Sequence, residues 1–239
     1  MARLENSPKL SIVIPSLNEA THLPLLIADL NLWPDQLEIC VCDACSSDES
    51  VLAAELSGAK VVRLSEPNRG AQLHYGASNT DGDWLLFLHA DCRMLREWPE
   101  VLTKIINQLE SRNIAWFFDF KVQGKRLEMK LLEIAVAIRS NLFKRPYGDQ
   151  GLLIHRSLYE EIGGYKHIYL MEDLDIVERL SKKVKIKSLC LPLYSDGRRW
   201  KNINYISKAL KNAKLRRRWR RGESSKQIFE KYYEKQVKG

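Results

Sequence analysis

Short apolar runs alternate with amphipathic segments along the first half of the chain. The apolar runs have the length expected of buried strands, and the segments between them show helical spacing. The predicted strands are 10–15, 37–42, 60–64, 83–88 and 114–122. The predicted helices between them are 20–32, 47–56, 70–78 and 99–109. This order predicts an α/β fold, with a mostly parallel central sheet and helices on both of its faces.

The pattern loosens after residue 122. It predicts a helix over 127–143, a turn and a strand over 148–155, a short helix over 173–182 and a strand over 184–189. From residue 202 onward it predicts two basic helices with a break near Gly222. We therefore expect one α/β domain over residues 1–200 and a basic helical C-terminal appendage over residues 201–239.

The net charge of +8 is unevenly distributed. Residues 198–239 contain 15 Lys and Arg against 3 Asp and Glu, so the rest of the chain is slightly acidic. Apolar positions between 203 and 219 form an imperfect helical stripe with basic flanks. This stripe suits contact with an anionic membrane, or packing against the domain. We expect no nucleic-acid partner, because no aromatic-bearing RNA motif accompanies the charge.

The N-terminus has no apolar core typical of a signal peptide, and no apolar run approaches the roughly 20 residues that cross a bilayer. We expect the protein to act in the cytoplasm or at the inner face of the membrane. The five cysteines are an odd number, which argues against a disulfide framework. Cys42 and Cys45 form a C-x-x-C pair, but a zinc site would need four ligands.

Polar and acidic groups follow four successive predicted strands. In open parallel sheets, ligands bind at the carboxyl ends of the strands. Any one of these groups could be a plain turn or a helix cap, but that explanation suits the whole set less well. The groups are Pro15-Ser16-Leu17-Asn18-Glu19, Asp43-Ala44-Cys45-Ser46-Ser47-Asp48, Glu66-Pro67-Asn68-Arg69-Gly70 and His89-Ala90-Asp91.

These residue types suit a nucleotide diphosphate. A carboxylate such as Asp43 can accept a base N–H, and Glu19 or His89 can accept a ribose hydroxyl. Arg69 opens a predicted helix, so a phosphate there would meet a guanidinium group and a helix N-terminus. Asp91 is a hard oxygen ligand for Mg²⁺ or Mn²⁺, which would stabilise a departing diphosphate.

Three segments together resemble a family 2 glycosyltransferase of the GT-A fold. They are SIVIPSLNE at 11–19, VCDACSSD at 41–48 and LFLHAD at 86–91, and the resemblance extends over roughly residues 10–200. It implies sugar transfer from a nucleotide diphosphate sugar to a hydroxyl acceptor, with inversion and with Mg²⁺ or Mn²⁺ as cofactor. It implies Asp91 as the metal ligand. The expected nucleotide-binding residues are Pro15, Asn18, Glu19, Asp43, Arg69, His89 and Ala90.

His89 departs from the family pattern, which usually has Asp at this position. In relatives this position tends to face the ribose, so ribose is the expected partner of His89. The His-Ala-Asp form resembles a bacterial branch of the family, as do residues 148–151 and 198–200. The resemblance slightly favours a UDP-sugar over a GDP-sugar as donor.

The second half of the chain is expected to supply the acceptor side. Glu172 and Asp173 follow Gly163-Gly164-Tyr165 and look like the Glu-Asp motif of the family. An inverting transfer needs a base for the acceptor proton, and the motif match assigns that role to Asp173, with Glu172 beside it. Helix capping is the alternative role for both carboxylates.

Two further segments are candidates for contact with the acceptor or the diphosphate. Asp149 and Gln150 lie between two glycines, in a segment that could equally be a plain turn. An arginine at 198–199 could neutralise diphosphate, and the tryptophan after it could stack on a sugar or a lipid acceptor. The alternative is that this segment only begins the basic tail. The second set of candidates is Arg198, Arg199 and Trp200.

Two other functions stay open at this point. A sugar nucleotidyltransferase would use the same sheet and metal, but it would carry a Gly-rich phosphate loop after the first strand. This chain has Pro15-Ser16-Leu17-Asn18-Glu19 there, which disfavours that function. A degenerate GT-A domain acting as a basic surface-binding module is the non-enzymatic alternative. His89 and the basic tail favour the degenerate domain, whereas Asp91, Glu172 and Asp173 argue against it. The other histidines, His22 among them, indicate only structural or surface roles.

Overall fold

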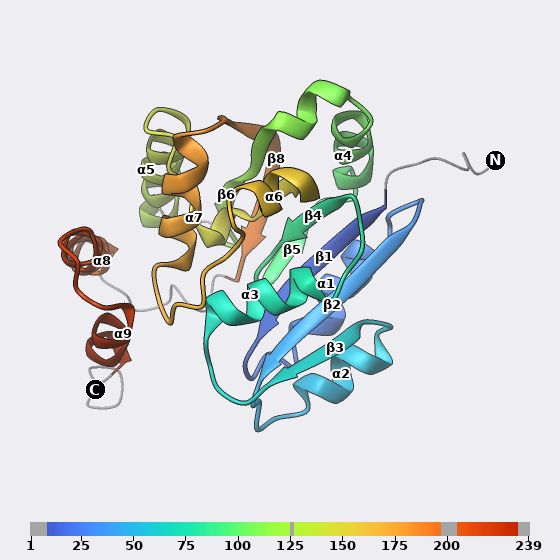
Figure 1. Cartoon of the computed structure of the whole chain (residues 1–239), viewed down its shortest axis with the longest axis horizontal. Coiled ribbons are helices and arrows are strands. Elements are labelled where there is room, and N and C mark those ends of the chain that lie inside the picture. Colours follow the sequence, from blue (N-terminus) through green and yellow to red (C-terminus); the bar gives the residue numbers. More distant parts are fainter. Residues whose placement is uncertain (1–8, 125–126, 197–204, 234–239) are drawn as a thin grey trace.

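The computed structural model describes residues 9–124, 127–196 and 205–233. An eight-stranded sheet runs through the molecule, with helices on both of its faces (Figure 1). The strand order is β3-β2-β1-β4-β7-β6-β8-β5. The strands are β1 (Leu10–Ser16), β2 (Leu37–Ala44), β3 (Lys60–Leu64), β4 (Trp84–Phe87), β5 (Cys92–Met94), β6 (Ile114–Val122), β7 (Leu152–His155) and β8 (Lys185–Ser195).

The helices mostly follow the predicted segments. Two short 3-10 helices, η1 (Leu109–Asn113) and η2 (Gly148–Gln150), accompany them. The α-helices are α1 (Leu23–Leu30), α2 (Ser50–Leu56), α3 (Arg69–Ser78), α4 (Trp98–Ile106), α5 (Leu127–Asn141), α6 (Arg156–Glu161), α7 (Glu172–Ser181), α8 (Tyr205–Arg220) and α9 (Ser225–Tyr233).

The sheet is mixed, although most of its strands run in one direction. β3, β2, β1 and β4 are parallel to one another, and β6 is parallel to β8. β7 lies antiparallel between β4 and β6, and β5 pairs antiparallel with β8 at the far edge. The predicted α/β fold with a mostly parallel sheet is therefore confirmed. The pattern did not predict β5 or α6, which are only three and six residues long.

The central strands are buried on both faces. Ile12 and Ile14 of β1 pack with residues of α1 and α4 on one face of the sheet. Val13 packs with residues of α3 and α7 on the other face. A strand covered by helices on both sides has apolar residues at consecutive positions, as at Ile12, Val13 and Ile14, which explains why the sequence predicts β1.

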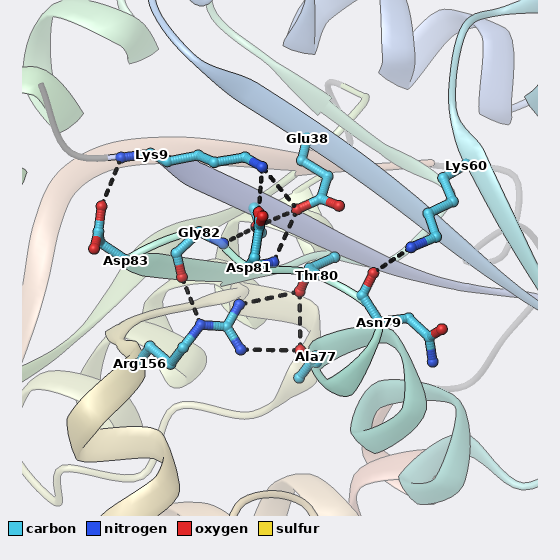
Figure 2. A network of polar contacts seen from close by, with 11 residues as sticks. Lys9, Glu38, Lys60, Ala77, Asn79, Thr80, Asp81, Gly82, Asp83 and Arg156 are labelled. Carbon is cyan, nitrogen blue, oxygen red and sulfur yellow. Dashed lines mark hydrogen bonds and ion pairs between the residues drawn. The ribbon is translucent and has the colours of Figure 1, made fainter. Parts of the chain in front are cut away.

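A polar network closes the amino ends of the parallel strands (Figure 2). Arg156 donates hydrogen bonds to the backbone oxygens of Gly82 and Ala77, at 2.6 and 3.0 Å. Glu38 Oε2 accepts the backbone N–H of Asp81 at 3.1 Å. These contacts connect the turn before β4 to β2 and α6, so the opposite, carboxyl ends of the strands are left to form a site.

The C-terminal helices pack on the rest of the protein. Leu215 of α8 is buried, and Arg220 pairs with Glu178 of α7 at 2.7 Å. The ring of Phe229 in α9 lies 5.6 Å from that of Tyr169. These contacts support the packing alternative for residues 205–233. In the described ranges, no helix combines the length and the hydrophobicity that a membrane span requires.

Candidate functional site

Two cavities adjoin at the carboxyl ends of β1 and β4. The strand-end cavity, of about 270 Å³, is lined by the segments after β1, β3 and β4 and by Tyr169 and Phe229. The helical cavity, of about 280 Å³, is lined by α5, α7, α8 and the loop before β7. Arg69, His89 and Leu170 line both cavities, so the cavities meet at these three side chains.

His89 and Asp91 lie where the chain leaves the centre of the sheet. β4 ends at Phe87, and the following residues lead to β5 at the far edge. Asp91 is buried and lines the strand-end cavity beside Ala90. The His89 ring packs against Gly148, where a Cβ would lie only 2.8 Å from His89 Nε2. The absent side chain of Gly148 therefore allows this approach.

Arg69 is a cation that both cavities share. It begins α3, and its guanidinium group lies 3.6 Å from the Glu172 carboxylate. The first turn of α3 is already capped, because Asn68 Oδ1 accepts one N–H at 3.0 Å and Gly70 donates its own to Ile168 O at 3.3 Å. Two N–H groups of this first turn are therefore already engaged, and binding of a phosphate to this helix N-terminus stays a prediction. Arg69 lines both cavities.

The loops after β1 and β2 are bonded to each other. Asn18 has a left-handed φ of 58°, which asparagine tolerates, and its Oδ1 accepts the backbone N–H of Ser47 at 2.8 Å. Asp43 is buried at its strand end, where it accepts the N–H and the hydroxyl of Ser46 at 3.0 and 2.5 Å. In this arrangement Asn18 and Asp43 shape the loops, and their contact with a nucleotide stays a prediction.

Glu19 lines the strand-end cavity together with Pro15, and a histidine orients its carboxylate. His22 Nδ1 lies 2.7 Å from Glu19 Oε2, and His22 Nε2 lies 3.0 Å from Asp196 Oδ2. The Glu19 backbone N–H donates to Ser50 Oγ at 2.7 Å. His22 thus joins the loop after β1 to the end of β8, a link that its spacing in the sequence does not reveal.

The predicted acidic residues of the second half meet in the helical cavity. Asp149, Glu172 and Asp173 all line it. Asp173 Oδ2 accepts the backbone N–H of Gly148 at 3.0 Å, and its Oδ1 accepts the N–H of Leu174 at 2.7 Å. The structure therefore brings the 148–151 segment and the Glu-Asp motif together beside His89.

Two carboxyl groups here titrate above their usual range. Burial raises the pKa of Glu172 to about 7, and Asp173 adds to the shift while Arg69 opposes it. Burial also raises the pKa of Asp149, where Arg139 opposes the shift and Asp173 adds to it. Among the described residues, Glu172 Oε2 and Asp149 Oδ1 are buried and lack a hydrogen-bond partner. Perturbed carboxyl groups lining a cavity are typical of functional sites.

Met171, directly before Glu172 and Asp173, has a strained backbone conformation. Its φ of 74° and ψ of 17° lie in the left-handed region, which is uncommon for a residue other than glycine. Such a conformation costs on the order of 1–3 kcal/mol and clusters at functional sites. Met171 also lines the helical cavity, so the strain lies where α7 begins and where Glu172 and Asp173 enter the site.

Gln150 lies beneath the loop instead of facing the cavities. It is 1% exposed, and its Nε2 donates to the backbone oxygen of Phe118 at 3.1 Å. Its Oε1 accepts from Ser140 Oγ at 2.5 Å and from Arg139 Nη2 at 3.0 Å. In this arrangement Gln150 ties the loop to β6 and α5, and its contact with acceptor or diphosphate stays a prediction. Three other candidates lie outside the described residues: Arg198, Arg199 and Trp200.

Several residues at the cavities were not predicted. Arg139 of α5 and Arg216 of α8 lie over the Tyr147 ring, at 4.0 and 5.4 Å from its centroid, and all three line the helical cavity. Phe229 of α9 lines the strand-end cavity. The sequence places Arg216 and Phe229 in a basic tail, and no local signal indicates that this tail folds back over the strand ends.

The sequence profile of glycosyl transferase family 2 matches residues 11–165. The match spans more than half of the chain. It includes strands β1 to β7, apart from Leu10 at the start of β1. The chain belongs to glycosyl transferase family 2. The resemblance predicted from the three sequence segments is thereby confirmed. Glu172 and Asp173 lie just beyond the matched range.

One similar relative is an uncharacterized glycosyltransferase of Haemophilus influenzae. It is 32% identical to this family 2 chain over 110 residues. The aligned stretch covers 45% of this chain and 37% of the relative. The likeness therefore spans little more than a third of that protein.

Solved structures of glycosyltransferases share the fold. S. aureus TarS in complex with UDP-GlcNAc has a TM-score of 0.64 and 16% identity, over 79% of this chain and 60% of that chain. The mannosyltransferase PcManGT from Pyrobaculum calidifontis, in complex with GDP-Man and Mn²⁺, also has a TM-score of 0.64, with 15% identity over 98% of this chain and 71% of that chain. The GT-A fold expected from the sequence is confirmed by these likenesses.

The family resemblance implies a divalent metal ion, and the residues present fit one. Asp91 offers a buried carboxylate at the wall of the strand-end cavity. In the ranges that the structure describes, no three His, Cys, Asp or Glu side chains gather as a metal site. Mg²⁺ is often held by one or two carboxylates plus substrate phosphates and water, so a single protein carboxylate is compatible with the ion.

Proposed function

We propose that this protein transfers a sugar from a nucleotide diphosphate sugar to an acceptor hydroxyl, with inversion and with Mg²⁺ or Mn²⁺. The observation that carries the proposal is the junction of the two cavities at Arg69 and His89, with Asp91 in one cavity and Asp173 in the other. A donor in the strand-end cavity would present its sugar at this junction to an acceptor in the helical cavity.

The strand-end cavity has the charges that a nucleotide diphosphate needs. The Arg69 guanidinium group, held near Glu172 at 3.6 Å, would bind diphosphate oxygens. Asp91 would hold the metal ion, which supplies Lewis-acid stabilisation of the departing diphosphate. Glu19, oriented by His22, would accept hydrogen bonds from the nucleoside. A UDP-sugar is slightly favoured over a GDP-sugar, from the family resemblance alone.

Asp173 is the proposed base of the acceptor side. The acceptor oxygen would form a bond to C1 of the sugar while the bond from C1 to the diphosphate oxygen breaks. The hydroxyl proton would pass to Asp173, and the electron pair would leave with the diphosphate. The two backbone N–H groups that donate to Asp173 keep its carboxylate oriented. Glu172, the residue before Asp173, would position Arg69 through the ion pair between Glu172 and Arg69.

The lining of the helical cavity indicates the kind of acceptor. Beside the acidic Asp149 and Asp173 it carries an extensive apolar wall. We propose an acceptor whose hydroxyl group is attached to an apolar body, because pockets bind ligands through an apolar lining with a few placed polar groups. The apolar wall consists of Phe120, Leu132, Val136, Leu170, Leu174 and Leu215.

The C-terminal appendage would take part in the site. We propose a catalytic domain over residues 1–200, with residues 201–239 completing both cavities through α8 and α9. Arg216 and Phe229 contribute to the cavity walls in this way. The proposed place of action is the cytoplasm or the inner face of the membrane.

Ligand-induced thermal stabilisation tests the proposal. UDP, GDP and their sugars are added with and without Mn²⁺, and we expect one nucleotide series to raise Tm further when Mn²⁺ is present. Asp91→Asn should lose the metal-dependent part of the shift. Asp35→Asn, which changes an exposed acid between α1 and β2, serves as the matched control and should keep it. If no nucleoside diphosphate raises Tm even with Mn²⁺, the proposed function is ruled out.

A further inference from the structure

Helix α5 carries apolar side chains on two opposite faces. On its inner face Met129 and Val136 are buried, and Val136 lines the helical cavity. On its outer face a second apolar row recurs every three or four residues, a spacing that brings its members onto one side of a helix. The outer stripe consists of Leu127, Leu131, Ile134, Ile138, Leu142 and Phe143, which are between 49% and 71% exposed.

A contiguous exposed row of this kind needs an explanation. Single exposed leucines are normal on protein surfaces, whereas contiguous apolar patches mark interaction sites. The outer face of α5 is exposed along the whole helix and continues into Leu142 and Phe143, directly after the helix ends.

Basic residues flank the outer stripe along α5 itself. Lys130 is exposed on the second turn of the helix. Lys144 and Arg145 are exposed and follow Phe143 directly. Leucine and phenylalanine beside lysine and arginine are the composition of helices that lie in the membrane interface.

Helix α8 adds further positive charge on the same side of the molecule. Arg139 of α5 and Arg216 of α8 both lie over the Tyr147 ring, so the two helices are neighbours across the helical cavity. Figure 1 shows both on the side opposite α2. Lys214 and Arg217 of α8 are exposed. The apolar stripe and the basic helix therefore belong to one side of the protein.

We propose that the outer stripe and the exposed basic residues of α8 together form a docking surface for an anionic lipid bilayer. The apolar side chains of α5 enter the headgroup boundary, and the lysines and arginines meet lipid phosphates. Charge complementarity favours this partner over a second copy of the chain. A two-fold dimer across the stripe would bring two sets of basic residues together, which like charges disfavour.

This docking would place the helical cavity next to the membrane. Leu132 and Val136 line that cavity from the inner side of the helix whose outer side carries the stripe. The proposal concerns binding to lipid and is tested without any sugar donor or acceptor. Its failure is therefore distinguishable from failure of the proposed transfer reaction.

Co-sedimentation with vesicles tests the docking surface. One set of vesicles contains phosphatidylcholine alone, and the other contains phosphatidylcholine mixed with phosphatidylglycerol. The unmodified protein should bind the anionic set more strongly. Leu131→Glu combined with Ile134→Glu should lower the partition coefficient at least about tenfold. Each change removes apolar area that would enter the bilayer and adds a negative charge that anionic lipids repel. Leu56→Glu, at an exposed leucine of α2, is the matched control and should bind normally.

Charge variants and solution size complete the test. Lys214→Glu with Arg217→Glu should weaken binding to anionic vesicles. Arg63→Glu, which changes an exposed arginine of β3, is the control and should leave binding unchanged. Unchanged melting temperatures establish that the variants are folded. The proposal is overturned if the unmodified protein ignores anionic vesicles at low salt, or if the control variants lose as much binding as the others. A dimer that Leu131→Glu converts to a monomer would assign the stripe to a second copy and would overturn it too.

Discussion

The backbone N–H of Gly148 donates a hydrogen bond to Asp173 Oδ2 at 3.0 Å. This bond connects the loop before β7 to the first turn of α7, and thus two segments that are far apart in the sequence. Gly148 also packs against the His89 ring, where a Cβ would lie 2.8 Å from Nε2. One glycine therefore couples a residue at the end of β4 to the proposed catalytic base.

Gly148→Ala is expected to slow sugar transfer without removing any functional side chain. The new methyl group would displace His89 or the loop and disturb the bond to Asp173. We expect kcat to fall at least about tenfold, because small misplacements of reacting groups are costly. Nucleotide binding should weaken by a smaller factor, because His89 is one of several expected nucleotide contacts. Initial rates and the nucleotide-induced Tm shift measure the two effects. Gly58→Ala, at a φ of +89° with open space around it, should lower stability and spare kcat; equal losses of kcat in both variants would contradict the coupling.

Asp173→Asn should nearly abolish transfer and leave nucleotide binding intact. The amide cannot take the acceptor proton, and general-base contributions are about 10²–10⁴-fold in rate. Product formation and the Tm shift with UDP or GDP are the measurements. Asp175→Asn is the control in the same helix: Asp175 pairs with Lys166 and Arg179 at 2.9 and 2.5 Å, so its loss should lower stability more than rate. Loss of nucleotide binding in Asp173→Asn would show that its role is misassigned.

The sequence predicted those features that depend on short stretches of chain. β1 and β2 each contain an apolar run, Ile12–Ile14 and Ile39–Cys42, because helices cover both faces of the sheet, and Asp91 lies four residues after the end of β4. Features that depend on distant contacts were missed. The N–H of Gly70 donates to Ile168 O, and Gln150 accepts a hydrogen bond from Ser140, and no local pattern in the sequence contains these contacts. The return of α8 and α9 over the strand ends likewise rests on contacts that no local pattern contains.

Arg69→Gln should weaken binding of nucleoside diphosphates. The guanidinium group is shared by both cavities, and hydrogen bonds to charged groups contribute about 1.5–3 kcal/mol, which corresponds to roughly 10–100-fold in affinity. Binding of the corresponding nucleoside, which carries no phosphate, should change little. Calorimetric titration with both ligands measures the difference. Arg63→Gln removes an exposed arginine on β3 and should leave both affinities unchanged. Equal weakening of nucleoside and diphosphate would contradict a phosphate role for Arg69.

Glu172 should make the stability of the protein depend on pH. Burial raises its pKa from the ordinary 4.5 to about 7, so between these values the folded protein holds a proton that the unfolded chain has released. The stability that Glu172 contributes is complete below its ordinary pKa and is lost as the pH rises to about 7. A shift of this size corresponds to a loss on the order of 3 kcal/mol in the free energy of unfolding.

Glu172→Gln isolates this contribution, because glutamine has no proton to lose. Urea unfolding of both proteins at about pH 5 and about pH 8 gives the difference in their free energies of unfolding, and we expect the unmodified protein to lose roughly 2–3 kcal/mol more than the variant over this interval. Glu161→Gln, at an exposed position of α6, should follow the unmodified protein at both pH values. A difference that stays constant between the two pH values would mean that Glu172 is already ionised at the lower one. In that case the Arg69 guanidinium group would outweigh burial at this position.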